Sequence, residues 1–295
     1  MLQSRVLGSG NKLSIPTPNA NSTIDPMDAK DARSTWDDLS LHDVSMTFNP
    51  GGGSEYPALE NASVKVRRGE FYCLVGPSGC GKSTLLNLIA GFVRPTSGTI
   101  RIGNRQIVDA GTDRVMVFQD ATNALFPWLR THENVEFGLS VQGVPKRQVS
   151  ERAMRCLDLV GLRDHAHKFP YELSGGMKQR CQLARALVLE PEVLLMDEPF
   201  AALDAISKRI MQKELLRIWR QFRMTVIYIT HDVGEAVLLG QKVAVMRRGP
   251  RSSVKEEFIV QEPYPRKPTD EIVITMNAKV EASLQEEVGD SLYAG

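Results

Sequence analysis

One stretch of the chain constrains its fold more than any other. It fits the phosphate-loop pattern G-x-x-x-x-G-K-[ST] in full and consists of Gly76, Pro77, Ser78, Gly79, Cys80, Gly81, Lys82, Ser83 and Thr84. Residues 70–75 before it have the pattern of a buried strand, and residues 84–90 after it have that of a helix ending at Gly91. A phosphate loop needs this order of strand, glycine loop and helix, so the stretch predicts a nucleoside triphosphate site.

The chemistry of the loop follows from its residue types. Glycines let the backbone wrap around phosphates with its N–H groups pointing inward, and the following helix adds a partial positive charge at its N-terminus. In this pattern the Lys82 ammonium reaches the β- and γ-phosphates, and the Ser83 hydroxyl is a ligand of Mg²⁺.

The composition limits the partners and the location. The 36 basic and 35 acidic residues of the 295-residue chain leave a formal charge of +1, so no overall field attracts nucleic acid or anionic lipid. The longest apolar runs are too short to span a bilayer, and no apolar segment precedes Pro16. We therefore expect no secretory signal, residence in the cytosol and no nucleic-acid partner. Four cysteines without pairing or metal-ligand spacing suit a reducing compartment, and we expect small buried side chains at Cys73, Cys80, Cys156 and Cys181.

The chain divides into three parts. Residues 1–38 are rich in Ser, Asn, Asp, Thr and Pro without an apolar period, which predicts a flexible tail. Residues 39–262 alternate strand and helix patterns and predict one nucleotide-binding domain, since no internal repeat occurs. Residues 263–295 begin with a Pro-rich hinge and continue with an amphipathic helix pattern.

The middle part has the pattern of an α/β fold. Short alternating strands over residues 41–48 and 62–66 indicate a small antiparallel sheet that leads into the phosphate-loop strand. A helical block over about residues 120–185 is inserted before two apolar strands, 192–198 and 224–229. Such strands fit a parallel sheet with helices on both faces and right-handed crossovers.

The first of these apolar strands ends in two acids, Asp197 and Glu198. An adjacent pair at a strand end suits hydrolysis, because one carboxylate can face a metal ion while its neighbour orients the attacking water.

Two helices near the C-terminus have apolar sides. For the helix over residues 205–222 the expected side is Ile206, Ile210, Leu215 or Leu216, Ile218 and Phe222. For the final helix it is Val273, Met276, Val280, Leu284 and Val288. The side of the final helix packs either against the domain itself or against a partner.

A second motif, Leu173–Arg180 with the sequence LSGGMKQR, resembles the signature of the ATP-binding cassette (ABC) family. The resemblance covers about residues 39–246 and includes Gln119 after a strand, the pair Asp197-Glu198, the triplet Ala202-Leu203-Asp204, and His231. The phrases LFPWL at residues 125–129, ENV at 133–135 and DEPFAALDA at 197–205 look most like the nitrate, sulfonate and taurine importer branch. The family has a P-loop NTPase (RecA-like) parallel core with an antiparallel β subdomain and an inserted helical subdomain.

The resemblance implies ATP and Mg²⁺ as cofactors. The implied catalytic residues are Glu198 as the base, His231 at the γ-phosphate, Lys82 and Gln119. The implied Mg²⁺ ligands are Ser83, Gln119 and Asp197. Adenine is expected to stack on Phe48, with Tyr56 as the alternative, because the Gly51-Gly52-Gly53 insertion blurs the register.

The family resemblance also implies partners. Ser174, Gly175 and Gly176 would face the ATP of a second copy in a head-to-tail homodimer, and Asp204 would communicate across the interface. A separate membrane permease would dock beside Gln119 on Phe126, Trp128 and Leu129, unless these three are core residues of the helical block. The system would include a periplasmic or extracellular solute-binding protein, with this chain peripheral on the cytoplasmic face of the inner membrane. The alternative is a soluble ABC-type ATPase that is not coupled to transport.

Overall fold

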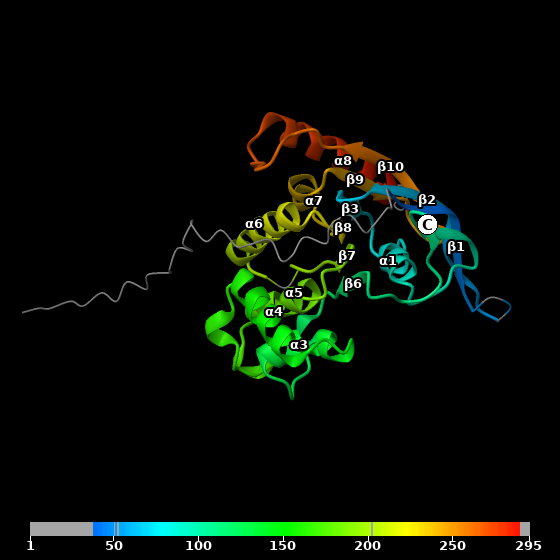
Figure 1. The fold of residues 1–295 in the computed structure, drawn as a ribbon. Coiled ribbons are helices and arrows are strands. Elements are labelled where there is room, and N and C mark those ends of the chain that lie inside the picture. The colour runs from blue at the N-terminus through cyan, green and yellow to red at the C-terminus, as the bar shows by residue number, and fades with distance from the viewer. Residues whose placement is uncertain (1–37, 50, 52, 202, 290–295) are drawn as a thin grey trace, which may run out of the picture. The chain divides into compact units, whose positions relative to one another are not determined.

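The computed structural model describes residues 38–49, 51, 53–201 and 203–289. The predicted tail therefore lies outside the described residues except for Asp38, as do Ala202 of the Ala202-Leu203-Asp204 triplet and residues 290–295. In chain order (Figure 1) the elements are β1 (Asp38–Phe48), β2 (Tyr56–Arg67), β3 (Phe71–Val75), α1 (Lys82–Ala90), β4 (Ser97–Ile102), β5 (Arg105–Gln106), β6 (Arg114–Val117), α2 (Ala121–Ala124), α3 (Thr131–Val141), α4 (Lys146–Leu159), η1 (Arg163–His165), η2 (Pro170–Glu172), α5 (Gly175–Leu187), β7 (Val193–Asp197), α6 (Ala205–Phe222), β8 (Thr225–Ile229), α7 (Val233–Leu239), β9 (Lys242–Met246), β10 (Val254–Ile259) and α8 (Glu271–Gly289).

A six-stranded sheet forms the centre of the domain, in the order β10-β9-β3-β8-β7-β6. The strands from β9 to β6 pair in parallel, and β10 adds an antiparallel edge. Every residue of β3 and β8 is buried, because helices and a second sheet cover both faces. The α/β fold with a parallel core is the one that the sequence predicts.

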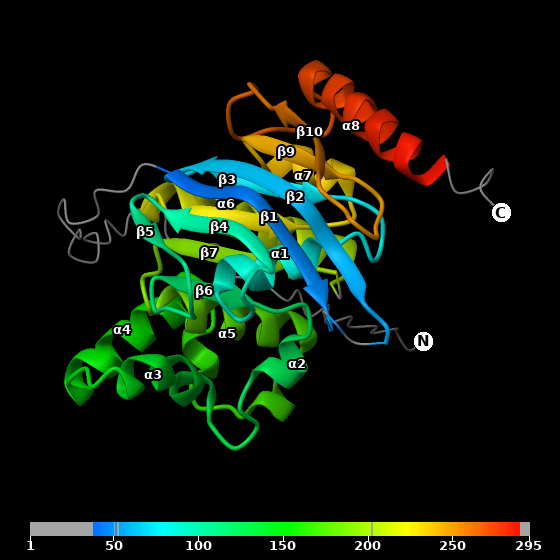
Figure 2. The ribbon, with the colours of Figure 1, turned by 90° about the vertical axis from the view of Figure 1, so that its right-hand side faces the viewer.

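A second, antiparallel sheet in the order β2-β1-β4-β5 lies over one face of the central sheet (Figure 2). Helix α1 packs in the same hydrophobic cluster as both sheets, and its Leu85 and Leu86 are fully buried. This packing holds the helix that begins at Lys82 against β7, with further contacts to β2, β6 and β8.

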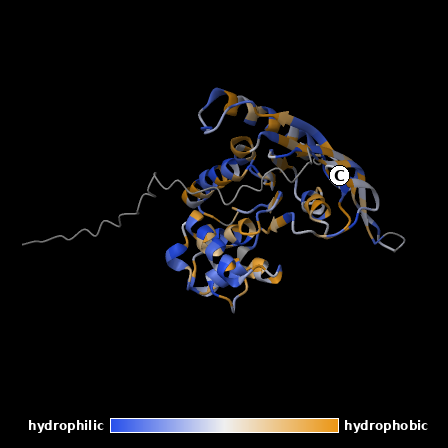
Figure 3. Ribbon diagram, viewed as in Figure 1, coloured by the Kyte–Doolittle hydropathy of each residue, from blue (hydrophilic) through white to orange (hydrophobic). Residues whose placement is uncertain are grey.

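The inserted helices α2 to α5 form a block beside β6, where α3, α4 and α5 pack against one another. Their ribbons are largely hydrophilic in colour at the bottom of Figure 3, as expected for helices that bury only one side. Val135, Leu139, Ala153 and Leu157 are among the side chains that close the interior of the block.

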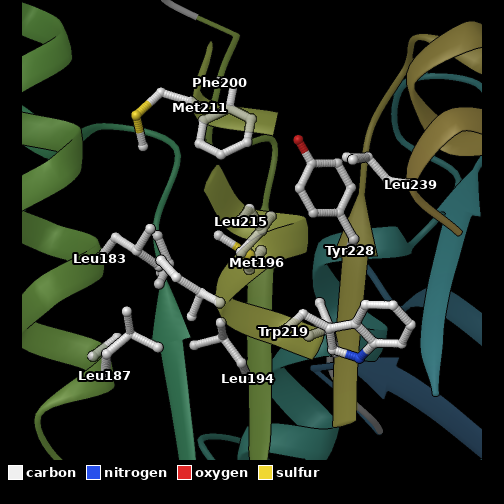
Figure 4. Packing of buried hydrophobic residues seen from close by; sticks show 14 of the residues in the cluster. Leu183, Leu187, Leu194, Met196, Phe200, Met211, Leu215, Trp219, Tyr228 and Leu239 are labelled. Atoms are coloured by element: carbon white, nitrogen blue, oxygen red, sulfur yellow. The ribbon is translucent and has the colours of Figure 1, made fainter. Parts of the chain in front are cut away.

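The other face of the central sheet is covered by α5, α6 and α7 (Figure 4). Trp219 on α6 stacks edge-on against Phe71 of β3 at 5.6 Å between ring centroids, and its Nε1 donates to the Gly69 carbonyl at 3.1 Å. Tyr228 of β8 lies beside Phe71 at 5.9 Å. Aromatic contacts thus join a helix, two strands and the turn that precedes β3.

The predicted apolar side of α6 is wrong at its N-terminal end. Ile206 and Ile210 are 74% and 50% exposed, whereas the buried residues are Met211, Leu215, Ile218 and Trp219. Apolar residues occupy two sides of this helix, so the 3.6-residue period alone allows either assignment. Contact with the aromatic side chains of the sheet selects the side that carries Met211 and Trp219.

Helix α8 packs against its own domain, on α7, β9 and β10. Val273 and Val280 are fully buried, Met276 and Leu284 are half-buried, and the side chain of Val288 is outside the described part. Lys255 of β10 adds ion pairs to Glu286 and Glu287 of α8 at 2.7 and 3.3 Å. The sequence allows this helix to pack either on its own domain or on a partner, and in the structure it packs on its own domain.

The four cysteines are free and buried, as predicted from the sequence. Burial raises the pKa of each thiol, to about 12 for Cys156 and for Cys181, so all four are uncharged at neutral pH. No helix within the described ranges combines the length and the apolar character that a membrane crossing requires.

We expect Met211→Ala to lower the free energy of unfolding by about 2–5 kcal/mol, because the substitution leaves a cavity beside the sheet. The neighbouring substitution Ile210→Ala should change it by less than about 0.5 kcal/mol, because this side chain is half exposed. Urea denaturation of both variants measures the difference. Equal losses, or a larger loss for Ile210→Ala, would contradict the observed packing of α6.

Candidate active site

The phosphate loop joins β3 to α1 and depends on glycine at two positions. Gly79 and Gly81 have φ angles of 76° and 91°, in the left-handed region that other residues rarely adopt. A Cβ atom on Gly81 would also lie 2.8 Å from the Leu59 Cδ2 atom of β2. Helix α1 has no side-chain cap at its N-terminus, so its first N–H groups remain free to bind an anion.

Lys82 is held directly over this loop. Its Nζ donates to the carbonyl oxygens of Gly76 at 2.7 Å and Pro77 at 2.8 Å, and it lies 3.7 Å from the Cys80 sulfur. Only 8% of the residue is exposed. Phosphate oxygens of a nucleotide would be stronger acceptors for this cation than the two carbonyls.

The carboxylates of the acid pair occupy different surroundings. Asp197 is the last residue of β7, and its carboxylate accepts a hydrogen bond from the Ser83 hydroxyl at the start of α1. Burial raises the pKa of Asp197, the Ser83 hydrogen bond opposes this, and the Glu198 charge adds to it. An oxygen pair formed by Asp197 and Ser83 at the mouth of a phosphate loop suits a hard divalent cation.

Glu198 stands in a strained backbone conformation. Its φ angle of 43° is left-handed, which costs a residue other than glycine about 1–3 kcal/mol. Its N–H donates to the Ile229 carbonyl of β8 at 3.0 Å. The contact ties the strained residue to the neighbouring strand.

Two side chains meet at the Glu198 carboxylate. The His231 Nδ1 atom lies 2.9 Å from Glu198 Oε2, and the Gln119 Nε2 donates to the same oxygen at 3.5 Å. Gln119 follows β6, Glu198 follows β7 and His231 follows β8, so the parallel sheet brings them together at its carboxyl edge. The structure therefore places these three predicted catalytic residues in one cluster.

The oxygen donors fit a bound Mg²⁺. Among the described residues no group of three or more His, Cys, Asp or Glu side chains could hold a metal. Mg²⁺ is commonly bound by one or two protein ligands together with phosphate and water oxygens, so a hydroxyl, a carboxylate and an amide oxygen are enough. Ser83, Asp197 and Gln119 would supply these groups.

The two candidate rings for adenine lie opposite each other. Phe48 and Tyr56 are directly paired across β1 and β2, and they are 37% and 47% exposed. The Tyr56 hydroxyl donates to the Gly79 carbonyl at 3.5 Å, which places this ring against the phosphate loop. Both rings are therefore available at this edge, and the choice of Phe48 stays a prediction.

The signature motif forms an open helix N-terminus. Ser174 is exposed and caps α5, where its Oγ accepts a hydrogen bond from the Met177 N–H at 3.3 Å. A Cβ atom on Gly175 would meet nothing within 4 Å, and one on Gly176 would meet only Leu203 Cδ2 at 3.4 Å. This end of α5 is therefore accessible from outside the protomer.

Asp204 lies beside this surface as the cap of α6. Its carboxylate accepts from the N–H groups of Ile206 and Ser207, both at 3.0 Å. The hydrogen bond from the Ser207 side chain, more than any other contact, lowers the pKa of Asp204. The residue is exposed next to Leu203, so the predicted communication residue and the signature share one face.

Helix α7, whose cap residue Asp232 follows His231, is not among the helices that the sequence analysis predicts. Its signal is the sequence Asp232-Val233-Gly234-Glu235, an acidic cap followed three residues later by Glu. In the structure Asp232 Oδ1 accepts from the Glu235 N–H at 3.0 Å. A helix of seven residues has too short an apolar pattern to be seen without this cap.

Comparison with known proteins identifies the family. A family model described as "ABC transporter" matches residues 59–201. The bicarbonate transport ATP-binding protein CmpD of Synechocystis is 42% identical over 85% of this chain and 88% of that protein. The chain belongs to the ABC transporter family. The resemblance found in the sequence is thus confirmed.

Other members of the ABC transporter family support the same assignment. The taurine import ATP-binding protein TauB of Roseobacter denitrificans is 45% identical over 74% of this chain and 81% of that protein. A dimeric structure of the ATP-binding cassette MJ0796 bound to ADP and Pi aligns with a TM-score of 0.67 and 30% identity, over 76% of this chain and 100% of that one. The ABC fold with its P-loop core is therefore established for this chain.

We expect Asp197→Asn to stabilise the nucleotide-free protein while removing Mg²⁺-dependent ATP hydrolysis. Because burial raises the pKa of Asp197 above the ordinary value of about 3.9, its ionisation is unfavourable in the fold. Wild-type stability should fall as the pH rises from about 4 through the folded-state pKa, and the variant should lack this component. Urea denaturation of the wild type and the variant between about pH 4 and pH 8 measures the free energy of unfolding of each protein. An identical pH dependence of the two proteins would contradict the expectation.

Proposed function

We propose that this chain is the ATP-hydrolysing subunit of an ABC importer, in which two copies bind two ATP molecules head to tail and drive a separate permease. The observation that carries the proposal is the meeting of Gln119, Glu198 and His231 at the carboxyl edge of the sheet, beside Lys82 and the Asp197–Ser83 pair. Phosphoryl transfer to water requires cations, N–H groups, a metal and an oriented water, and these residues provide places for all of them.

Phosphate binding falls to the loop and to Lys82. The glycines turn the loop N–H groups inward, α1 adds its positive end, and the Lys82 ammonium moves from the Gly76 and Pro77 carbonyls to the phosphates. Ser83, Asp197 and Gln119 would hold Mg²⁺, which when bound neutralises charge that develops on the phosphates.

Glu198 acts as the general base. Its carboxylate accepts from Gln119 and from His231, which together orient it toward a water at the γ-phosphate. When His231 Nδ1 donates to Glu198, Nε2 lies on the opposite side of the ring, and a proton on Nε2 would let that side donate to a phosphate oxygen. His231 would then connect the base to the phosphate that the water attacks.

Two copies are needed because each protomer offers its signature outward. The accessible N-terminus of α5 with Ser174 and Gly175 suits the γ-phosphate of a nucleotide held by another copy. Support comes from the dimeric state of the related ATP-binding cassette MJ0796. ATP would join the copies, and hydrolysis would release them.

The permease would dock on the helical block. Trp128 is 70% exposed, so it is not a core residue, while Phe126 and Leu129 are half-buried. The Phe126 ring packs at a tilt against that of Phe137, with 4.6 Å between centroids, and the Arg185 guanidinium lies over the Phe126 ring at 4.4 Å, so these side chains form one aromatic surface. Aromatic and arginine side chains of this kind dominate many protein interfaces.

The relatives define the class of transport system. The relatives named above specify bicarbonate transport and taurine import, and a further relative, the nitrate import ATP-binding protein NrtD of Synechococcus elongatus, is 43% identical over 85% of this chain and 89% of that protein. We infer a small solute of the nitrate, sulfonate or taurine type, delivered by a solute-binding protein, with this chain peripheral on the cytoplasmic face of the membrane. A soluble ATPase without a transport partner is not favoured, because these relatives are named as import or transport proteins.

We expect Glu198→Gln to abolish turnover, lowering kcat at least about 100-fold, while ATP still binds and holds the dimer together. Lys82→Ala should instead weaken ATP binding itself, because it removes the cation at the phosphates. Size-exclusion chromatography with ATP and a phosphate-release assay separate the two effects. Hydrolysis by Glu198→Gln at the wild-type rate would rule out Glu198 as the base.

We expect Trp128→Ala to weaken association with native membranes by about tenfold or more, since large exposed aromatics act as anchors of interfaces. ATP hydrolysis by the isolated chain should stay within about twofold of wild type, because the Trp128 ring is exposed and packs on Phe126 of the helical block, with 5.5 Å between ring centroids. Ile259→Ala, at an apolar residue of β10 that is 62% exposed, is the matched control. Membrane sedimentation of tagged chains measures binding, and equal retention of both variants would exclude Trp128 from the contact.

A further inference from the structure

A charged side chain next to the catalytic cluster is fully enclosed. Glu235 of α7 is 5% exposed and makes four polar contacts. Its Oε1 accepts from the Tyr228 hydroxyl and the Gln212 Nε2, both at 2.9 Å. Its Oε2 accepts from the Thr230 hydroxyl at 2.6 Å and pairs with Lys208 Nζ at 3.3 Å.

This arrangement is costly as a means of holding the core together. Removing a carboxylate and an ammonium group from water costs several kcal/mol for each, and packed apolar side chains often stabilise a core better. Burial, followed by the nearby Glu235 charge, raises the pKa of Tyr228 and keeps its hydroxyl a donor. The hydrogen bond from Lys208 to Asp232 and the Glu235 charge outweigh burial, so the pKa of Lys208 is raised and the group stays cationic.

Hydrogen bonds of Glu235 and Lys208 hold the residues on both sides of His231, Thr230 and Asp232. Thr230 before it is held by Glu235, and the Asp232 N–H after it donates to the Thr230 hydroxyl at 3.1 Å. The Asp232 carboxylate accepts from Lys208 at 3.0 Å and from the Glu235 N–H at 3.0 Å. The His231 side chain is 66% exposed, so apart from its contact with Glu198 its place depends on the backbone that carries it.

The same contacts reach the interface side of the protomer. Lys208 lies one turn into α6, and its N–H donates to the carbonyl of the cap residue Asp204 at 2.8 Å. A displacement of the N-terminus of α6 at the proposed dimer face would move Lys208. Because Lys208 donates to the Asp232 carboxylate, the residue that follows His231 would move as well.

We propose that Glu235 is a positioning residue for His231: with Lys208 it fixes the Thr230–Asp232 loop so that His231 Nδ1 stays at Glu198, and it ties this loop to the Asp204 end of α6. The inference rests on the proposed function and deepens it. It adds a residue that touches neither nucleotide nor water but decides whether the histidine and the base are aligned.

The test is Glu235→Gln in the full chain, which keeps the size of the side chain and removes the charge that faces Lys208. We expect kcat for ATP to fall at least about tenfold, while KM and the affinity for ATP stay within about twofold. Glu214→Gln is the control, because Glu214 lies on α6, the helix that carries Lys208, but in the described part of the chain its ion pair is with Arg217 and not with the Glu235 contacts. The control should keep the wild-type kcat.

A double-mutant cycle separates positioning from general stability. In a His231→Ala background, Glu235→Gln should reduce the residual single-turnover rate by less than about twofold, because it acts through the missing ring. A full and independent loss in that background would overturn the proposal. If Glu235→Gln does not fold, Lys208→Met tests the same contacts from the more exposed side and is expected to give the same split of kcat and KM.

A measurement that does not depend on ATP hydrolysis distinguishes the proposed role of Glu235 from the proposed function of the chain. The chain has five histidines, and the His231 imidazole signal is identified in a histidine-labelled NMR spectrum by its loss in His231→Ala. Glu235→Gln should shift or broaden that signal, and Glu214→Gln should leave it in place. An unmoved His231 signal together with wild-type kcat overturns the inference, whereas absent ATP hydrolysis by the wild-type chain overturns the proposed function.

Discussion

Parallel pairing of β6, β7, β8 and β3 is the constraint from which the site follows. In this register Leu74 lies beside Ile229, Ile229 beside Asp197, and Met196 beside Val117. Within two residues of these positions the strands lead into the phosphate loop, His231, Glu198 and Gln119, so one hydrogen-bonded ladder sets all of their positions. Buried strands make this ladder rigid, because slipping by one residue would exchange its two covered faces. The strain at Glu198 is held by the same ladder, through its bond to Ile229.

Local motifs explain why much of the site could be predicted from the sequence. The phosphate loop, the acid pair and the signature are each contiguous, and their chemistry depends on residue types at fixed short spacings. The inward side of α6 could not be predicted at its start, because Ile206 and Met211 lie on different sides and only the sheet decides between them. The contacts of Glu235 bring together α6, β8 and α7, so no single stretch of sequence contains them. Phe48 and Tyr56 stay alternatives for a related reason: cross-strand pairing places both rings at one edge.

In the proposed function each protomer has two separate phosphate-binding sites, and their separation explains how ATP binding could move one part of the dimer relative to another. One site is the phosphate loop over the sheet, with Lys82 buried in it. The other is the open start of α5, on the helical block that also carries the exposed Trp128. A nucleotide held between copies would pull the block of one protomer toward the sheet of the other. Movement of the block would then reach a permease bound at its aromatic surface.

The central claim is that each ATP site is shared by two copies, and mixing two inactive variants tests it most directly. A chain with Lys82→Ala lacks the phosphate-loop half, and a chain with Ser174→Arg lacks the signature half. In a head-to-tail dimer the mixed pair regains one complete site, so the mixture should recover up to about a quarter of wild-type ATP hydrolysis, while each variant alone stays inactive. A mixture that stays as inactive as its components would show that each protomer builds its site alone and would contradict the account.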